Sequence, residues 1–208
     1  MKGLVVFDLD GVLIDSNEAN YQAFRQGILA AGLAEPTREA VTCLIGMPAL
    51  KMLQRLGCPE ERCSHIYTTV VKPHYLEHLP QLARPIEQAH QVLSALLARG
   101  YRIGACTSGD RVTQEKALGS IGVRQLIEHM QTPDDSLHNK PQVRYLQELV
   151  ERFPSTSNIY HVEDSEVGLQ MGLDGGATTI FADYGYGRPG ALQPHHRISR
   201  LSQILELV

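Results

Sequence analysis

The chain has 208 residues, which suits one domain with an insertion or two small domains. Hydrophobic residues make up 43% of it, enough for a buried core and far from the composition of a disordered chain. The formal net charge of −4 argues against a basic nucleic-acid-binding surface, so no nucleic-acid partner is expected. A small anionic substrate would therefore need a locally positive pocket.

Cysteine usage and hydropathy bear on where the protein works. No apolar run approaches the ~20 residues that span a bilayer, and the N-terminus does not read as a signal peptide. Cys58 and Cys63 could pair or bind a metal, but no CxxC pattern is present, and free thiols in a reducing compartment fit better. We therefore expect a cytoplasmic protein without a membrane partner, either a monomer or a dimer.

The first part of the chain predicts one strand followed by helices. Residues 3–8 form a short apolar run typical of a buried strand. Asp15, with Glu18 three residues later, indicates a capping box at a helix start. From there to about Leu82 the periodicity is helical, and no strand is expected. The helix that begins near residue 20 is predicted to end at Gly32, and further prolines and glycines divide the rest into shorter helices.

From Pro85 onward, the sequence predicts alternating helices and strands. Helices are expected at 86–100, 111–122, 141–153, 166–176 and 199–207, and strands at 101–108, 126–130, 158–165 and 177–183. Such alternation is typical of a parallel sheet with right-handed crossovers. We therefore expect an α/β fold in which residues 1–15 and 83–208 form a Rossmann-like core and residues 16–82 form an inserted α-helical cap. The segment 79–85, with two prolines, is expected to be a hinge.

Polar residues gather where the predicted strands end, and ligands bind at that edge of an open parallel sheet. The sets are Asp8-Leu9-Asp10, Thr107-Ser108-Gly109 and Glu163-Asp164-Ser165, together with Lys140-Pro141 at a predicted helix start. Clustered carboxylates repel one another unless a cation joins them, and hard oxygen ligands suit Mg²⁺, which can also hold a phosphate. Hydroxyls, helix N-termini and a lysine would hold phosphate oxygens.

Two carboxylates separated by one residue can divide the work of phosphoryl transfer. One can attack phosphorus to form an aspartyl-phosphate, and the other can protonate the leaving group and then deprotonate the attacking water. The strand-end residues therefore predict Mg²⁺-assisted phosphoryl transfer, in which catalysis is mostly positioning and charge neutralisation.

Four segments resemble, in order, the motifs of the haloacid dehalogenase (HAD) superfamily. They are FDLDGVLIDS (7–16), ACTSG (105–109), NKPQ (139–142) and VEDSEVGLQMG (162–172). The resemblance covers nearly the whole chain. It is greatest to the subgroup with a small helical (C1-type) cap, which includes phosphoglycolate phosphatases and β-phosphoglucomutases.

The resemblance implies a role for each catalytic position. Asp8 would be the nucleophile and a Mg²⁺ ligand. Asp10 would be the general acid and base, and its backbone carbonyl would also meet the metal. Lys140 would neutralise Asp8 and the phosphoryl oxygens. Asp164 would be the second carboxylate on the metal, and Glu163, where many relatives have Gly, could touch the metal's water shell.

Smaller residues are implied in binding the phosphate. Thr107 matches the hydroxyl position of the second motif better than Ser108, and Gly109 completes this loop. Gly11 could be a plain turn glycine, a point where the backbone approaches the substrate closely, or both. Arg111 could reach an anionic substrate or lie in solvent.

Other residues help to choose the reaction. Dehalogenases of this superfamily lack the carboxylates at the positions of Asp10 and Asp164. β-Phosphoglucomutases carry an Arg in a Gly-Val-Ser-Arg stretch and a His early in the first cap helix, where this chain has 46–49 (GMPA) and Asn20. Both departures favour hydrolysis over mutase chemistry. His74 and His78 have metal-pair spacing, but no third ligand is near in the sequence, so a solvated face is expected.

The segment 183–190 (DYGYGRPG) resembles the segment at this place in phosphoglycolate phosphatases and their relatives. The expectation is a Mg²⁺-dependent phosphatase acting on a small phosphorylated metabolite such as 2-phosphoglycolate or a sugar phosphate. The alternatives are a β-phosphoglucomutase-like phosphomutase and a catalytically weak phosphometabolite-binding protein.

Overall fold

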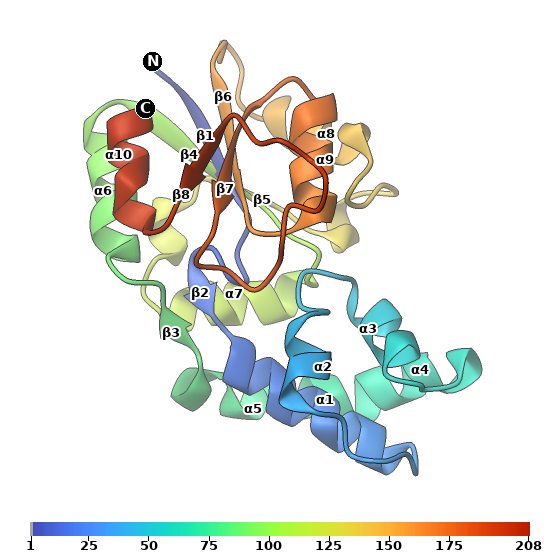
Figure 1. Cartoon of the computed structure of the whole chain (residues 1–208). Helices are drawn as coiled ribbons and strands as arrows, with labels where there is room; N and C mark the ends of the chain where they lie inside the picture. Colours follow the sequence, from blue (N-terminus) through green and yellow to red (C-terminus); the bar gives the residue numbers. More distant parts are fainter. Residues whose placement is uncertain (1) are drawn as a thin grey trace.

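The computed structural model describes residues 2–208, and within them six parallel strands form one sheet (Figure 1). In spatial order the strands are β5 (His129–Gln131), β4 (Tyr101–Cys106), β1 (Gly3–Phe7), β6 (Ile159–Glu163), β7 (Thr178–Ala182) and β8 (His196–Ile198). All residues of β1 are buried, because a central parallel strand is covered on both faces and so reads as a continuous apolar run. The predicted α/β class with a Rossmann-like parallel sheet is confirmed.

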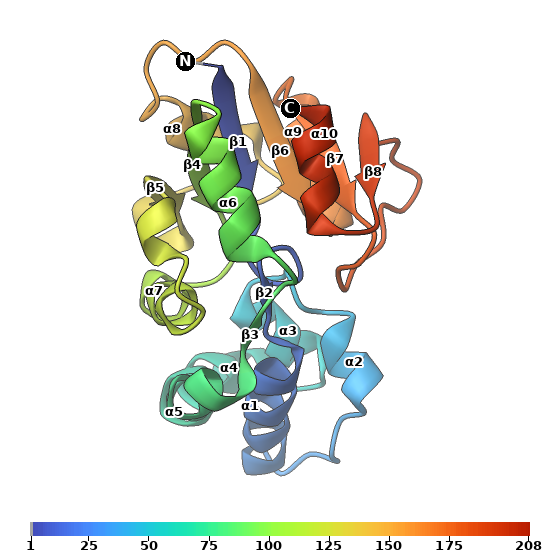
Figure 2. The ribbon, with the colours of Figure 1, turned by 90° about the vertical axis from the view of Figure 1, so that its left-hand side faces the viewer.

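Helices cover both faces of the sheet. Alternate β1 residues point to opposite faces: Leu4 and Val6 share a buried cluster with α8 (Val143–Val150) and α9 (Glu166–Asp174). Val5 and Phe7 belong to the cluster that contains α6 (Ala89–Ala98) and α10 (Ile204–Leu207). Figure 2 shows α6 and α10 in front of the sheet, with α8 and α9 behind it.

A group of helices lies beyond the carboxyl ends of the strands (Figures 1 and 2). It consists of α1 (Asn17–Ala30), α2 (Arg38–Thr42), α3 (Ala49–Arg55), α4 (Glu60–Ile66), a π-helical turn η1 (Tyr67–Val71) and α5 (Lys72–Leu82). Two segments connect this group of helices to the sheet, and they form an antiparallel pair, β2 (Ile14–Asp15) with β3 (Arg84–Pro85). Among residues 2–208, no helix combines the length and apolar character needed to cross a bilayer.

Strand register brings the polar strand ends together. Phe7 pairs with Val162 of β6 on one side and with Ala105 of β4 on the other. The Asp8 amide then donates to the Val162 carbonyl (2.9 Å), which sets Asp8 beside the end of β6. The next helix after β4, α7 (Arg111–Ser120), begins at the same edge.

The predicted capping box at Asp15 is wrong. Helix α1 has Ser16 as its N-cap residue and no side-chain cap hydrogen bond. Asp15 belongs to β2 and accepts a hydrogen bond from the Tyr186 hydroxyl (2.7 Å), while Ser16 Oγ donates to Asp10. Asp15 Oδ1 also accepts from the Asn17 amide (3.2 Å), but no capping box forms, because the Glu18 carboxylate accepts from Gln22 and Arg38 instead.

Several element boundaries also differ from the prediction. The strand expected at 126–130 begins only at His129, after a 3₁₀ turn at Arg124–Leu126. Helix α8 begins at Val143, so Pro141 precedes the N-cap residue Gln142 and does not occupy the first helical turn. The edge strand β8 was not expected, because two of its three residues are exposed and polar.

Candidate active site

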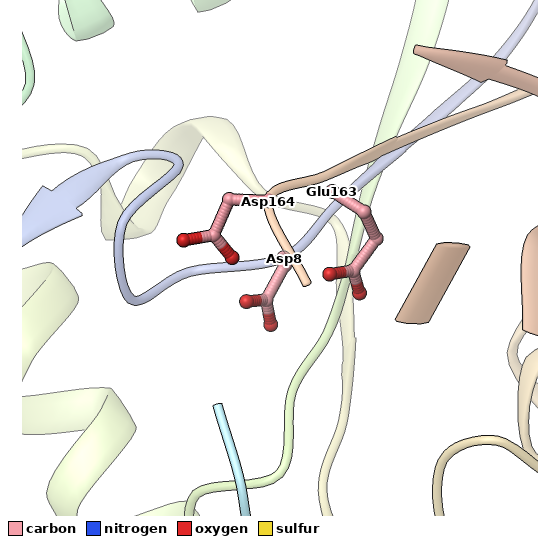
Figure 3. Close-up of side chains that lie close together, drawn as sticks. All are labelled: Asp8, Glu163 and Asp164. Carbon is pink, nitrogen blue, oxygen red and sulfur yellow. The ribbon is translucent and has the colours of Figure 1, made fainter. Parts of the chain in front are cut away.

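Three buried carboxylates meet at the ends of β1 and β6. Asp8, Glu163 and Asp164 each offer an oxygen, and these three oxygens lie within 4.8 Å of one another. Figure 3 shows the three side chains side by side. Within residues 2–208 this is the one group of three or more acidic, His or Cys side chains with the spacing of metal ligands.

One buried ammonium serves this cluster. Lys140 Nζ lies 2.8 Å from Asp8 Oδ1 and also contacts Glu163 Oε1. The three side chains are 2%, 3% and 1% exposed, so none of these charges is solvated by bulk water. A buried charge must be paired to be tolerated. With Asp164 included, three carboxylates face one ammonium, which leaves a deficit of positive charge.

The pKa values of the site reflect that deficit. Burial, together with the charge of Glu163, raises the pKa of Asp8 to about 6, although Lys140 acts to lower it. Burial and the charges of Asp8 and Glu163 raise the pKa of Asp164 to about 8. Burial acts to lower the pKa of Lys140, but the two carboxylates raise it well above its ordinary value, so it stays charged. A divalent cation fits this donor set, because it would replace the missing positive charge.

Glycines pack closely around Asp164. The amide of Tyr186 donates to Asp164 Oδ2 (2.7 Å). A Cβ atom at Gly11, Gly185 or Gly187 would come closer than 3.0 Å to atoms of Asp164. Gly11 also has a φ of +84°, so it is both a turn glycine and a point of close approach, and the atoms it approaches belong to Asp164.

Asp10 is held by two donors that the motifs did not indicate. Gln114 Nε2 donates to Asp10 Oδ2 (2.9 Å), and Ser16 Oγ donates to Oδ1. Burial raises the pKa of Asp10, while these two hydrogen bonds act to lower it. Gln114 lies on α7, four residues after the N-cap residue Asp110, a spacing that puts the two on one helix face. That spacing after the second motif is the signal that could have identified it.

The predicted phosphate-binding loop faces the same space. Thr107 is buried, its hydroxyl accepts from the Gly109 amide (3.2 Å), and its carbonyl accepts from Tyr145 Oη (2.7 Å). The loop runs into the N-terminus of α7. It lines a cavity of about 420 Å³ between the strand ends and the helical group, and its lining residues include Asp8, Asp10, Thr107, Ser108 and Gly109. Lys140, Glu163 and Asp164 are not among the lining residues, and they reach the cavity through their contacts with Asp8.

Arg111 and the His74–His78 pair both have structural partners. Arg111 is bonded to Glu115, Asp135 and the Met130 carbonyl, and it is not among the cavity-lining residues. His74 and His78 stack with ring centroids 4.1 Å apart and are half-buried, not simply solvated. Neither belongs to the cluster of potential metal ligands.

The four cysteines are free thiols. Cys43, Cys58, Cys63 and Cys106 form no disulfide in residues 2–208.

The loop 183–190 has a structural role. Its Tyr186 hydroxyl accepts from the amides of Ser16 and Asn17, and its Tyr184 hydroxyl donates to the Val12 carbonyl. These tyrosines join the loop after β7 to the connection between the sheet and α1, a role the motif comparison had not indicated.

Comparison with known proteins agrees with this architecture. The family model described as "Haloacid dehalogenase-like hydrolase" matches residues 5–182. A phosphoglycolate phosphatase of Agrobacterium fabrum is 27% identical over 155 residues, 72% of this chain and 66% of that protein. A pyrophosphatase, PpaX, of Bacillus velezensis is 24% identical and covers 98% of this chain and 94% of that protein.

Solved structures share the fold. The crystal structure of a "predicted phosphoglycolate phosphatase" from Haemophilus somnus superposes with a TM-score of 0.89 at 21% identity, and covers 99% of this chain and 97% of that one. The family model confirms the predicted family and hydrolase class, and the phosphatase prediction agrees with the names of the relatives. The chain belongs to the haloacid dehalogenase-like hydrolase family.

Proposed function

We propose that the protein is a Mg²⁺-dependent phosphatase that hydrolyses a small phosphate monoester through an aspartyl-phosphate on Asp8. The observation that carries this proposal is the cluster of three buried carboxylates, two of them paired with one buried ammonium, in which Asp8 lines the cavity. Asp8, Asp164 and the Asp10 carbonyl would hold the metal, and Glu163 would reach its water shell. When bound, Mg²⁺ would neutralise the phosphoryl oxygens and hold the phosphate against Asp8.

The roles of the chain's own groups follow from their contacts. Lys140, fixed by Asp8 and Glu163, keeps its proton and offers positive charge at the nucleophile. Thr107, Ser108 and Gly109 at the start of α7 would bind the phosphate oxygens. Asp10, which has a raised pKa, would protonate the leaving oxygen and then take a proton from the water that attacks the phosphorus.

The division of the chain is part of the same proposal. Residues 1–15 and 83–208 would act as the catalytic core, and residues 16–82 as a cap that closes over the substrate. Residues 79–82 of the predicted hinge 79–85 belong to α5, so the hinge would instead be the paired segments β2 and β3, the two points where the chain passes between these parts.

A metal-dependence assay with a nucleophile variant tests the proposal. Wild-type protein and Asp8→Asn would be assayed on phosphate monoesters, including 2-phosphoglycolate and sugar phosphates, with Mg²⁺ or with EDTA. We expect EDTA to abolish turnover, Mg²⁺ to restore it, and Asp8→Asn to lower kcat by about 10⁴-fold or more while the protein stays folded. Turnover that resists EDTA, or a variant as fast as wild type, would contradict the proposal.

The mutase alternative has its own assay. Incubation with β-glucose 1-phosphate and the 1,6-bisphosphate yields glucose 6-phosphate only if the enzyme is a mutase. We expect inorganic phosphate and no such conversion. Asn20, where the mutases carry a histidine, donates its amide to Ser16 Oγ (3.0 Å) and to the Ser16 carbonyl (3.1 Å).

A further inference from the structure

The helical side of the cavity is mainly apolar. Its lining includes Phe24, Ile45, Met47, Leu50, Met52 and Val71. These residues come from α1, α3 and the turns next to α3 and α5, so the apolar surface spans several elements. A charged group placed against this surface would lose its hydration without gaining a partner, which is costly.

Of the two basic side chains that line the cavity, one is neutralised by a carboxylate and the other is exposed to solvent. Among the lining residues, all of which lie in the described chain, the bases are Lys51 and Lys72. Lys72 Nζ lies 2.8 Å from Asp110 Oδ1, and the Tyr67 hydroxyl donates to Asp110 Oδ2 (2.6 Å). Lys51 is exposed and donates to the neutral side chain of Gln54 (3.1 Å), so its charge stays in solvent.

The Lys72–Asp110 pair connects the two sides of the cavity. Lys72 begins α5 in the helical group, whereas Asp110 is the N-cap residue of α7 in the core. The side chains of the pair are 28% and 17% exposed, so water screens them only in part. Asp110 therefore cancels the charge of Lys72 at the place where the distal part of a substrate would lie.

We propose that this site selects phosphate monoesters whose leaving group is uncharged and has apolar surface, and that the Lys72–Asp110 pair causes it to reject leaving groups that carry a carboxylate or a second phosphate. The proposal rests on the proposed phosphatase function and narrows its substrate class. It also sets this chain apart from relatives named for glycolate phosphate or pyrophosphate, whose leaving groups are anions.

Matched ester pairs test the selection. Phenyl phosphate would be compared with 4-carboxyphenyl phosphate, and n-propyl phosphate with 2-phosphoglycolate, as kcat/KM with Mg²⁺. We expect the uncharged member of each pair to be favoured about tenfold or more, because an unpaired carboxylate would be desolvated against the apolar wall. Equal values, or a preference for the carboxylated esters, would overturn the proposal.

The Asp110→Asn variant tests the cause. Asparagine keeps an acceptor for the Thr113 amide at the start of α7 but removes the charge that neutralises Lys72. We expect the preference ratio to move toward the carboxylated ester by about tenfold or more. The gain should disappear in the Asp110→Asn/Lys72→Met double variant. An unchanged ratio in Asp110→Asn would refute the role of the ion pair.

Matched controls separate this result from general damage. Asp134→Asn also alters a carboxylate bonded at the start of α7, to the Arg111 amide (2.7 Å), but Asp134 is not among the cavity-lining residues, so its ratio should match wild type. Inactivity toward every ester would refute the proposed phosphatase function instead. The same ester pairs would then be compared by calorimetric binding to Asp8→Asn, where tighter binding of the carboxylated member would overturn the selection.

Discussion

The two sides of the cavity are built on different principles. On the strand side, the carboxylates of Asp8, Glu163 and Asp164 are buried, and strand register and close-packed glycines hold them in place. On the helical side, the wall is mainly apolar, and its Lys72 is paired with Asp110 of the core side. The first side fixes the geometry of a reaction, while the second decides what enters. The comparison indicates that these two properties can change separately within one fold.

The largest effect that would sharpen this comparison is expected at Gly185. A Cβ added at Gly185 would lie closer than 3.0 Å to the Cβ of Asp164, which is too close. Because the Asp164 Cβ is attached directly to the backbone that follows β6, it cannot shift unless that backbone also shifts. We expect Gly185→Ala to displace Asp164 and weaken activation by Mg²⁺ about a hundredfold, measured as the Mg²⁺ concentration needed for half-maximal activity.

Gly119→Ala is the matched control. Gly119 is exposed near the end of α7, and a Cβ there would meet nothing within 4 Å. This control should keep wild-type activation by Mg²⁺ and gain up to about 1 kcal/mol of stability from helix propensity. If Gly185→Ala is activated like the control, the strand side is less rigid than the structure indicates.

A smaller effect is expected at Gln114, which lines the cavity and holds Asp10 from α7. In Gln114→Met the donor to Asp10 is lost while the side-chain volume is kept. We expect kcat to fall about tenfold and KM to change little, because Gln114 positions a group that acts in the transition state. Since its hydrogen bond lowers the pKa of Asp10, the alkaline limb of the rate profile should move to higher pH.

The control for this prediction is Gln125→Met. Gln125 is exposed and donates only to the Gly122 carbonyl (2.8 Å), so kcat and the pH profile should stay as in wild type. If Gln114→Met changed KM and left kcat and the profile unchanged, Gln114 would be a substrate contact and not a positioning residue.

The strand side could be predicted from the sequence and the helical side could not, for physical reasons. Residues such as Asp8 and Asp164 end apolar runs, and parallel strands bring such ends together whatever lies between them. The partners of these residues come from packing. Ser16 and Tyr186 reach the site through the paths of loops, which leave no period in the sequence, whereas Gln114 could be found only by its helical spacing from Asp110.

The same limit explains the errors at element boundaries. Asp15 and Glu18 have the spacing of a capping box. However, Asp15 accepts a hydrogen bond from Tyr186, which lies in a loop about 170 residues later. A pattern within a few residues cannot predict a partner so distant in the sequence. Likewise β8 is an exposed edge strand, recognised only by its pairing with β7. The Lys72–Asp110 pair joins two residues 38 positions apart, so it could not be predicted from the sequence around either one.

The smallest expected effect is on the stability of the metal-free protein. If this effect is not observed, the contrast between the two sides of the cavity does not hold. The pKa of Asp164 is raised from its ordinary value of 3.8 to about 8, first by burial and then by the charges of Asp8 and Glu163. Between these two values the folded protein holds a proton that the unfolded chain has released. Stability should therefore fall as the pH rises through this window and level off above pH 8.

Thermal unfolding measures that slope directly. In EDTA, raising the pH from 6 to 8 should lower Tm by several degrees, since about 1 kcal/mol corresponds to roughly 2–4 °C for a domain of this size. Saturating Mg²⁺ should flatten the slope, because the cation stabilises the ionised carboxylates. Asp164→Asn should flatten it without metal. A Tm that rises with pH in EDTA, or an unchanged slope in Asp164→Asn, would mean that the buried carboxylates are balanced without a cation, and the strand side would then lose its argument for a metal.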